Sequence, residues 1–401
     1  MAQVQDDQIS ILAAPDARTP EMLRVPAAIG PETFGGSTQH FNVFYANSLG
    51  TNGAALADAV LLSCEQNYSS LQDLFGGITP AGLPFEVHIQ PGSNGASHRG
   101  CGGTKLFCDA FHGDDGILED MLVVGEADEV FMANQKRGWD CGANNGEALS
   151  RIIADALTGR NFFSAIFWLN SQRKNFVNQN DRSDRHFDSI GCGTLFINYL
   201  RFQLGFDLAQ IVQNGGPTLA QTSVNLGGSS YPFEPFALLL ELNFPPGTPV
   251  NVNLDHDNPF PLTMSTVPLT GLVHLQNIGD VDFLNDEFAG TQGQSRRLEG
   301  FQIQFDPPVP DLSMRYMAHL QDIGDVSWVH EGQFIGTRGQ SRRLEGFAIE
   351  LTGPASADYS VMYMAHLQGL GDTGFFRDGQ FCGTRGQSRR VEGMLVHVGP
   401  R

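Results

Sequence analysis

Near the C-terminal end of the chain, one set of hydrogen-bonding side chains occurs three times. Each copy has a histidine, two glutamines, an aspartate and an arginine in the same order. These groups together can donate and accept hydrogen bonds, which suits the hydroxyl groups of a sugar, and an aromatic ring could cover a pyranose face. The candidate ligand-binding residues are His274, Gln276, Asp280, Gln294, Arg296, His319, Gln321, Asp325, Trp328, Gln340, Arg342, His366, Gln368, Asp372, Gln387 and Arg389.

These residues belong to a sequence repeat. The tripeptide His-Leu-Gln starts at positions 274, 319 and 366, so successive units begin 45 and 47 residues apart. The segment Gly-Thr-x-Gly-Gln-Ser-Arg-Arg-(Leu/Val)-Glu-Gly follows in each unit, from positions 290, 336 and 383. Short strands with turn signals, present in three copies, predict a closed three-fold all-β domain, either a β-prism or a β-trefoil. We expect it to cover residues 269–401, with units of about 269–312, 313–358 and 359–401.

The last strand of each unit predicts which charged residues face the core. Arg297 and Glu299 have the same parity as Phe301, so we expect them to pair at the rim of the core, because an unpaired buried charge is costly. The same holds for Arg343 with Glu345 and for Arg390 with Glu392. The preceding arginines, Arg296, Arg342 and Arg389, point the other way and are expected to be freer to meet a ligand.

The units resemble the clostridial hydrophobic-W repeats, whose pattern is a strand with His-(Val/Leu)-Gln, then Ile-Gly-Trp, then Gly-Thr-x-Gly-Gln-Ser-x-Arg-Leu-Glu. The resemblance spans about residues 269–399, and aspartates 280, 325 and 372 replace the namesake tryptophan. It implies adhesion and presumed glycan-binding modules attached to secreted proteins. The main hypothesis is therefore a lectin-like or cell-surface adhesion protein with three equivalent sites, whose partner is a glycan or a cell-surface polysaccharide.

A second group of candidate residues is acidic. Glu126 and Glu129 lie on a predicted helix over 115–136, and Glu147 lies in the first turn of the next helix. If the three carboxylates converge, they raise one another's pKa values and form an acid–base site or a site for a hard cation. Alternatively, Glu147 pairs with Arg151 one turn later on its own helix and no site exists. We favour the second interpretation.

The elements that would position these acids predict an α+β domain over residues 39–245. Strands are expected over 40–45 and 85–89, separated by a helix over 53–75 and followed by a glycine-rich hairpin. Only helices follow, over 115–136, from 144 or 145 onward, and over 162–173, 190–204, 207–214 and 233–242. Helices segregated behind strands are typical of α+β folds. Residues 1–38 are predicted to be an N-terminal arm, and residues 246–268 a proline-rich linker.

The order of these elements resembles the catalytic domain of gluzincin metallopeptidases. In that family a His-Glu-x-x-His helix is followed by a glutamate ligand on the next helix. The matching stretch here is Gly125 to Glu129, so Glu126 would match the general base and Glu147 the third ligand. Both histidines are absent, and carboxylates alone do not suit a catalytic zinc ion. The resemblance therefore implies a pseudo-metallopeptidase with no metal or cofactor, in which Glu126 is catalytic only if activity persists and Glu129 and Glu147 are weak metal candidates.

The cysteines leave three alternatives open, namely a disulfide, two free thiols or a metal site. Cys101 and Cys108 are close in sequence within the predicted hairpin, so a disulfide between them is plausible. With His98 and His112 they would instead form a zinc clip, a less favoured interpretation because the spacing matches no established ligand pattern.

Composition limits the classes of partner. The 401-residue chain has a net charge of −20, which disfavours nucleic acid because phosphates require a basic surface. No apolar run is long enough to span a bilayer, and the first fifteen residues lack the basic region of a signal peptide. The resemblance nevertheless indicates a secreted or cell-surface protein. The alternative hypotheses are an atypical peptidase-like hydrolase targeted by its repeats, and a structural protein that forms oligomers.

Overall fold

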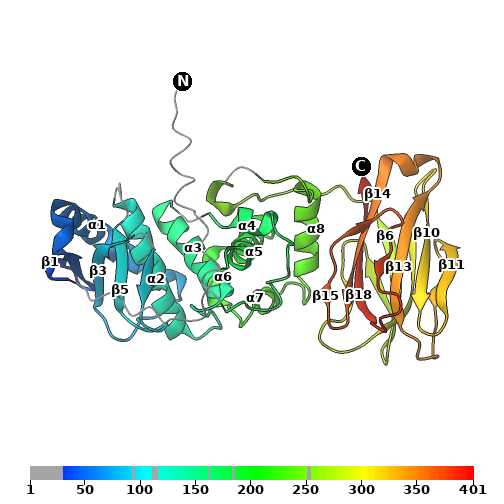
Figure 1. Cartoon of the computed structure of the whole chain (residues 1–401), viewed down its shortest axis with the longest axis horizontal. Helices are drawn as coiled ribbons and strands as arrows, with labels where there is room; N and C mark the ends of the chain where they lie inside the picture. The colour runs from blue at the N-terminus through cyan, green and yellow to red at the C-terminus, as the bar shows by residue number, and fades with distance from the viewer. Residues whose placement is uncertain (1–29, 93–94, 111–115, 161–162, 183–185, 251–253) are drawn as a thin grey trace, which may run out of the picture.

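The computed structural model describes residues 30–92, 95–110, 116–160, 163–182, 186–250 and 254–401. It contains an α+β part followed by an all-β part, and the last long helix of the first part lies against the second (Figure 1). Most of the predicted arm lies outside the described residues. Its final residues belong to the first strand of the α+β sheet, so the ordered fold begins earlier than the expected boundary at residue 39.

The α+β part is built on one five-stranded sheet with the order β1-β2-β3-β5-β4. The strands are β1 (Glu32–Ser37), β2 (Phe41–Ala46), β3 (Phe85–Pro91), β4 (Ala96–His98) and β5 (Lys105–Ala110). β2, β3 and β5 are parallel, and the outer strands β1 and β4 run antiparallel to their neighbours. Alternating apolar residues such as Val87 and Ile89 are fully buried, which explains why these segments form strands.

Helices pack against this sheet and then continue as a helical region (Figure 1). They are α1 (Gly50–Leu74), α2 (Ile117–Gln135), α3 (Asn144–Thr158), α4 (Ala165–Leu169), α5 (Phe187–Asn198), the π-helix η3 (Tyr199–Gln203), α6 (Leu208–Gln213), α7 (Leu219–Asn225) and α8 (Phe233–Asn243), with short 3-10 turns η2 (Asn47–Leu49) and η4 (Asp255–Asp257). The predicted helices over 53–75 and 115–136 are confirmed as α1 and α2. The helix expected over 162–173 is reduced to the five residues of α4.

The all-β part consists of three antiparallel sheets, one for each sequence unit. Unit 1 supplies β6 (Leu269–Leu275), β7 (Gly279–Leu284) and β9 (Leu298–Phe305); unit 2 supplies β10 (Ser313–Leu320), β11 (Gly324–His330) and β13 (Leu344–Thr352); unit 3 supplies β14 (Tyr359–Leu367), β15 (Gly371–Asp372), β16 (Phe376–Arg377) and β18 (Val391–Pro400). The 3-10 helix η5 (Pro354–Asp358) joins units 2 and 3.

Each sheet is completed by a short strand from a neighbouring unit. β12 (Ile335–Gly336) of unit 2 pairs with β9, β17 (Cys382–Gly383) of unit 3 pairs with β13, and β8 (Ala289–Gly290) of unit 1 pairs with β18. These exchanges link the three units in a ring. Glycine is required where the strands cross, since a Cβ on Gly336 would lie 2.3 Å from the Cα of Gly300.

The three sheets share one apolar core. The predicted inward faces of the last strands are confirmed, because Phe301, Phe347 and Val396 are fully buried in a single cluster. The aromatic rings in this cluster are in contact, with the centroids of Phe301 and Phe347 5.6 Å apart. The core fixes the orientation of each hairpin and therefore the position of the polar residues at its end.

Candidate functional site

Three junctions between units bring together most of the candidate polar residues. We call the contact of units 1 and 2 the first junction, that of units 2 and 3 the second junction, and that of units 3 and 1 the third junction. In the first, the Asp280 carboxylate accepts a hydrogen bond from His274 Nδ1 at 2.5 Å. Arg338 of the next unit donates to the same carboxylate from Nε at 3.1 Å and from Nη2 at 3.0 Å. Such a bidentate pair fixes both side chains in one geometry.

In the first and second junctions, an aromatic ring also packs against the arginine guanidinium. The Arg338 guanidinium lies 3.5 Å from the centroid of Phe334, and that ring packs on Gly300 of the preceding unit. The second junction repeats the arrangement: Asp325 accepts from His319 Nδ1 at 2.6 Å and from Arg385 Nε at 3.0 Å. Arg385 in turn lies 3.4 Å from the ring centroid of Phe381. The two junctions therefore present the same chemistry to solvent.

The aspartates of these two junctions are anionic at neutral pH. Hydrogen bonds from Arg338 and then from His274 hold the pKa of the Asp280 carboxyl below its usual value. The hydrogen bond from Arg385 acts in the same direction on the pKa of Asp325, followed by the hydrogen bond from His319. Each carboxylate is available as a hydrogen-bond acceptor.

The third junction has a different composition. Gln292 of unit 1 stands where the other junctions have an arginine, and its amide donates to Asp372 at 3.2 Å. His366 Nδ1 keeps its hydrogen bond to Asp372 at 2.6 Å. The remaining donor comes from the α+β part, since Asn175 Nδ2 donates to Asp372 at 2.7 Å.

Other residues of the α+β part complete this contact. Asn178 Nδ2 donates to Gln292 Oε1 at 2.6 Å, and Gln292 donates to Glu234 of α8. The ring centroids of Tyr231 and Phe288 are 4.9 Å apart. Tyr231 thus covers Phe288, as an arginine covers the equivalent phenylalanine in each of the other junctions. The α+β part therefore occupies the third junction.

The expectation of three equivalent sites is consequently wrong. The side chains of Asp280 and Asp325 are 40% and 51% exposed, whereas that of Asp372 is 8% exposed. Residues of the α+β part cover the third junction, and the first and second junctions are exposed.

An apolar contact and a buried acid accompany this docking. Leu238 of α8 packs on Met362, Met364 and Leu395, and all four side chains are buried. Burial raises the pKa of the Glu234 carboxyl to about 8, and the charge of Asp372 acts in the same direction.

The other candidate residues of the repeats have mixed positions. Three arginines that were expected to be freer to meet a ligand are instead bonded within their own units. Each donates to the backbone carbonyl of the His-Leu-Gln glutamine, at 3.4 Å for Arg296, 3.0 Å for Arg342 and 2.9 Å for Arg389. They close the hairpin end and hold residues Gln276, Gln321 and Gln368 in place. The second glutamines, Gln294, Gln340 and Gln387, are exposed beside them.

The expected arginine–glutamate pairs at the core rim are confirmed. Arg297, Arg343 and Arg390 donate from Nε to Glu299, Glu345 and Glu392 at 2.9, 2.8 and 2.7 Å. Trp328 lies on β11, where its ring faces the Arg315 guanidinium at 5.0 Å. Arg315 is four residues before His319 on β10, so Trp328 is not part of the second junction.

A cavity lies at the first junction. Its volume is about 380 Å³, and its lining includes His274, Gln276, Ile278, Arg297 and Ser341. Ile278 is exposed, as are the equivalent residues Ile323 and Leu370. No prediction from the sequence includes these apolar residues, although an apolar side chain stands between the His-Leu-Gln and Gly-Asp segments in all three units.

In the α+β part, Glu126 and Glu129 both approach one histidine. His98 Nδ1 lies 2.6 Å from Glu126 Oε2 and 3.7 Å from Glu129 Oε2. Burial lowers the pKa of the Arg151 guanidinium, and the charge of Glu147 most strongly opposes that shift. The expected pairing of Glu147 with Arg151 stays a prediction. The contact with His98 joins residues 28 apart in sequence, and no local spacing indicates it.

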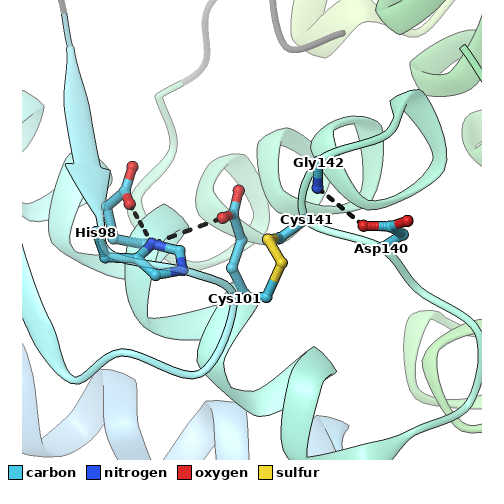
Figure 2. Close-up of a disulfide and its surroundings, with 7 residues drawn as sticks. His98, Cys101, Asp140, Cys141 and Gly142 are labelled. Carbon is cyan, nitrogen blue, oxygen red and sulfur yellow. Dashed lines mark hydrogen bonds and ion pairs between the residues drawn. A yellow bond between two sulfur atoms is a disulfide. The ribbon is translucent and has the colours of Figure 1, made fainter. Parts of the chain in front are cut away.

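The disulfide differs from the expected one. Cys101 is bonded to Cys141, with a Cα–Cα distance of 5.8 Å (Figure 2). Cys108 is buried and is not bonded to Cys101. This pairing excludes the clip of Cys101 with Cys108, and His112 lies outside the described residues. The nearby ligand atoms of His98, Glu129 and Cys141 lie within 4.8 Å of one another.

Comparison with known families agrees with the repeat analysis. Residues 274–307, 319–353 and 366–398 each match the family described as clostridial hydrophobic W, whose members are typically extracellular or cell-surface proteins. No curated protein matches the chain, and no family match supports the metallopeptidase resemblance. Within the described ranges, every helix is too short or too polar to cross a membrane. Residues 274–398 therefore consist of three clostridial hydrophobic W repeats.

Proposed function

We propose that this protein binds glycans at a cell surface through its first and second junctions. The observation that carries the proposal is the third junction, where a neutral amide donor from Asn175 binds Asp372 beside His366. Asp280 and Asp325 each accept a hydrogen bond from the equivalent histidine of their own unit, and both side chains are exposed. A sugar hydroxyl or an acetamido N–H is a donor of the same kind as the asparagine amide.

The surroundings of the first junction support a sugar ligand. The cavity of about 380 Å³ has polar groups that can select hydroxyl orientations. The exposed side chain of Ile278 provides an apolar surface for the face of a pyranose ring. Two such sites on one rigid ring would bind a polymeric glycan with higher avidity than either site alone.

The arrangement of sheets supports the β-prism among the two expected folds. Three separate sheets around one core, each completed by a strand from its neighbour, fit a prism of three faces. In such a fold the hairpin ends gather at one end of the molecule. Both exposed junctions would then face the same surface.

We infer that the α+β part is an inactive domain that supports the repeats. His98 Nδ1 lies 2.6 Å from Glu126 and 3.7 Å from Glu129, which supports a structural role for these two acids. The alternative, a hydrolase targeted by the repeats, requires Glu126 to act as a base.

The test is a glycan array that includes bacterial surface polysaccharides, probed with the full chain and with the double variant Asp280→Ala/Asp325→Ala. We expect the full chain to bind a set of glycans and the double variant to lose at least tenfold in affinity while keeping its melting temperature, because exposed ion pairs contribute about 0–1 kcal/mol. The matched control is Asp358→Ala. Asp358 is an exposed aspartate directly before β14, at the end of that strand away from His366. Equal binding by all three proteins would refute the assignment.

A further inference from the structure

We propose that the Cys101–Cys141 disulfide masks a metal site, and that its reduction creates a zinc centre ligated by Cys101, Cys141, His98 and Glu129. The four residues come from three segments: the β4–β5 hairpin, helix α2 and the link between α2 and α3. Figure 2 shows His98 facing the disulfide.

In the described part of the chain, one ring nitrogen of the histidine is held by a carboxylate and the other is left without a hydrogen-bond partner. Its Nδ1 is bonded to Glu126 at 2.6 Å, whereas its Nε2 is buried and has no hydrogen-bond partner among the described residues. The side chain is 4% exposed. A carboxylate on one ring nitrogen and a metal on the other is the usual arrangement of zinc-bound histidines. A buried unpaired nitrogen otherwise has an energetic cost, which a bound cation would remove.

The other ligands are within reach. One ligand atom from each of His98, Glu129 and Cys141 lies within 4.8 Å of the other two, and Cys101 is bonded to Cys141. Two thiolates, an imidazole nitrogen and a carboxylate oxygen form a set that tetrahedral zinc accepts. Asp140 also lies within 4.8 Å of both cysteines and is the competing oxygen ligand.

Reduction changes the sulfur atoms from non-ligands to ligands. A phosphine attacks one sulfur and releases the other as a thiolate; water then converts the thiophosphonium to the phosphine oxide and frees the second thiol. The phosphine is oxidised, the disulfide is reduced by two electrons, and one water supplies the oxygen and both protons. Zinc binding then displaces the two thiol protons, because thiolates are the ligands. Metal and disulfide would each tie the same two segments together.

The experiment compares the full chain with and without a phosphine reductant during anaerobic titration with Co²⁺, followed by competition with Zn²⁺. We expect one equivalent of Co²⁺ in the reduced protein, with a thiolate-to-cobalt charge-transfer band, and no such band in the oxidised protein. Zinc should displace the cobalt and raise the melting temperature of the reduced protein.

Variants assign the ligands. Cys141→Ser should abolish the charge-transfer band or halve it, and His98→Gln and Glu129→Gln should each weaken Co²⁺ binding at least tenfold. Cys64→Ser, which changes a buried free cysteine outside the cluster, should leave binding unchanged. Weaker binding in Asp140→Asn but not in Glu129→Gln would overturn Glu129 as the oxygen ligand. A folded reduced chain that binds no Co²⁺, or a reduced chain that unfolds and is not restored by zinc, overturns the site.

Discussion

At the scale of single residues, the position held by Arg338, Arg385 and Gln292 distinguishes the three junctions. Asp280, Asp325 and Asp372 have the same sequence context and the same histidine contact, yet their surroundings differ because unit 1 carries Gln292 in place of an arginine. Gln292 accepts a hydrogen bond from Asn178 and donates to Glu234, whereas an arginine there has donors only and could not accept from Asn178. Gln292 therefore suits the third junction to contact with the α+β part.

The first prediction concerns stoichiometry. Asp325→Ala should halve the number of glycan sites in the full chain, from two to one, because it removes the carboxylate of one of two exposed junctions. Isothermal titration with a glycan selected on the array measures this number. Asp372→Ala is the comparison, and we expect it to leave the stoichiometry at two. If either variant lost one third of the measured glycan sites, the three junctions would be equivalent and the assignment of two sites would be wrong.

A second prediction concerns Glu126. Glu126→Gln should change no hydrolytic activity and should lower stability by about 1 kcal/mol, since the variant replaces a charge-assisted hydrogen bond to His98 with a neutral one. Activity against a peptide library and the urea unfolding midpoint measure the two effects. A turnover that the wild type shows and this variant lacks would establish the hydrolase alternative.

At the scale of elements, a buried acid lies at the contact between α8 and the sheet of unit 3. Glu234 of α8 is buried against Gln292 and Asp372, and Asp372 is bonded to His366. Burial raises the Glu234 pKa from its ordinary value of 4.5 to about 8, and the charge of Asp372 acts in the same direction. Because Asp372 belongs to unit 3, its share of the shift is present only in the docked state, which therefore binds this proton more tightly than the separated state. The stabilising contribution is complete below the ordinary pKa and is lost as the pH rises through about 8.

The third prediction follows from the raised pKa of Glu234. The contact should weaken progressively between about pH 5 and pH 9, because the carboxyl must then ionise in a buried position. Small-angle scattering should show a larger radius of gyration at the higher pH. In Glu234→Gln the dimensions should stay constant, and the same expansion in both proteins would locate the titrating group elsewhere.

The disulfide gives a fourth prediction at this scale. It connects residues 40 apart, and the loop-entropy relation assigns such a bridge about 4 kcal/mol of stabilisation. Cys101→Ser/Cys141→Ser, measured by denaturant unfolding in the presence of a chelator, should lose stability of this order in the α+β part. A loss below about 1 kcal/mol would show that the unfolded chain keeps the hairpin near α3.

At the scale of the whole molecule, local patterns in the sequence predict the units well and their contacts poorly. The long helices α1 and α2, the inward faces of the repeat strands and the rim pairs follow from periodicity within a few residues. The seven-residue α7 is too short for such a pattern. The Asn175–Asp372 contact joins residues 197 apart, and the Cys101–Cys141 bridge joins residues 40 apart. Such pairs depend on tertiary packing, which no spacing in the chain records.

The fifth prediction tests the occupied junction. The repeats have their own core, so residues 268–401 should fold when expressed alone. They should then bind three equivalents of the glycan instead of two, with the added site weaker because Gln292 lacks the charge of an arginine. Titration calorimetry of the fragment and of the full chain measures the difference, and equal stoichiometry would show that docking does not block the third junction.

The ring of exchanged strands also fixes how such a domain can change during evolution. Each sheet depends on two residues from another unit, and Val267 N donates to Val398 O at 2.7 Å, so the two ends of the ring meet. A duplication or deletion of one unit would change the number of sheets, and the ring of exchanged strands could no longer close in the same way. By contrast, a circular permutation that joins the ends and opens the chain between two units keeps every pairing. Lineages carrying this ring should therefore vary in where the chain starts and not in how many units it has.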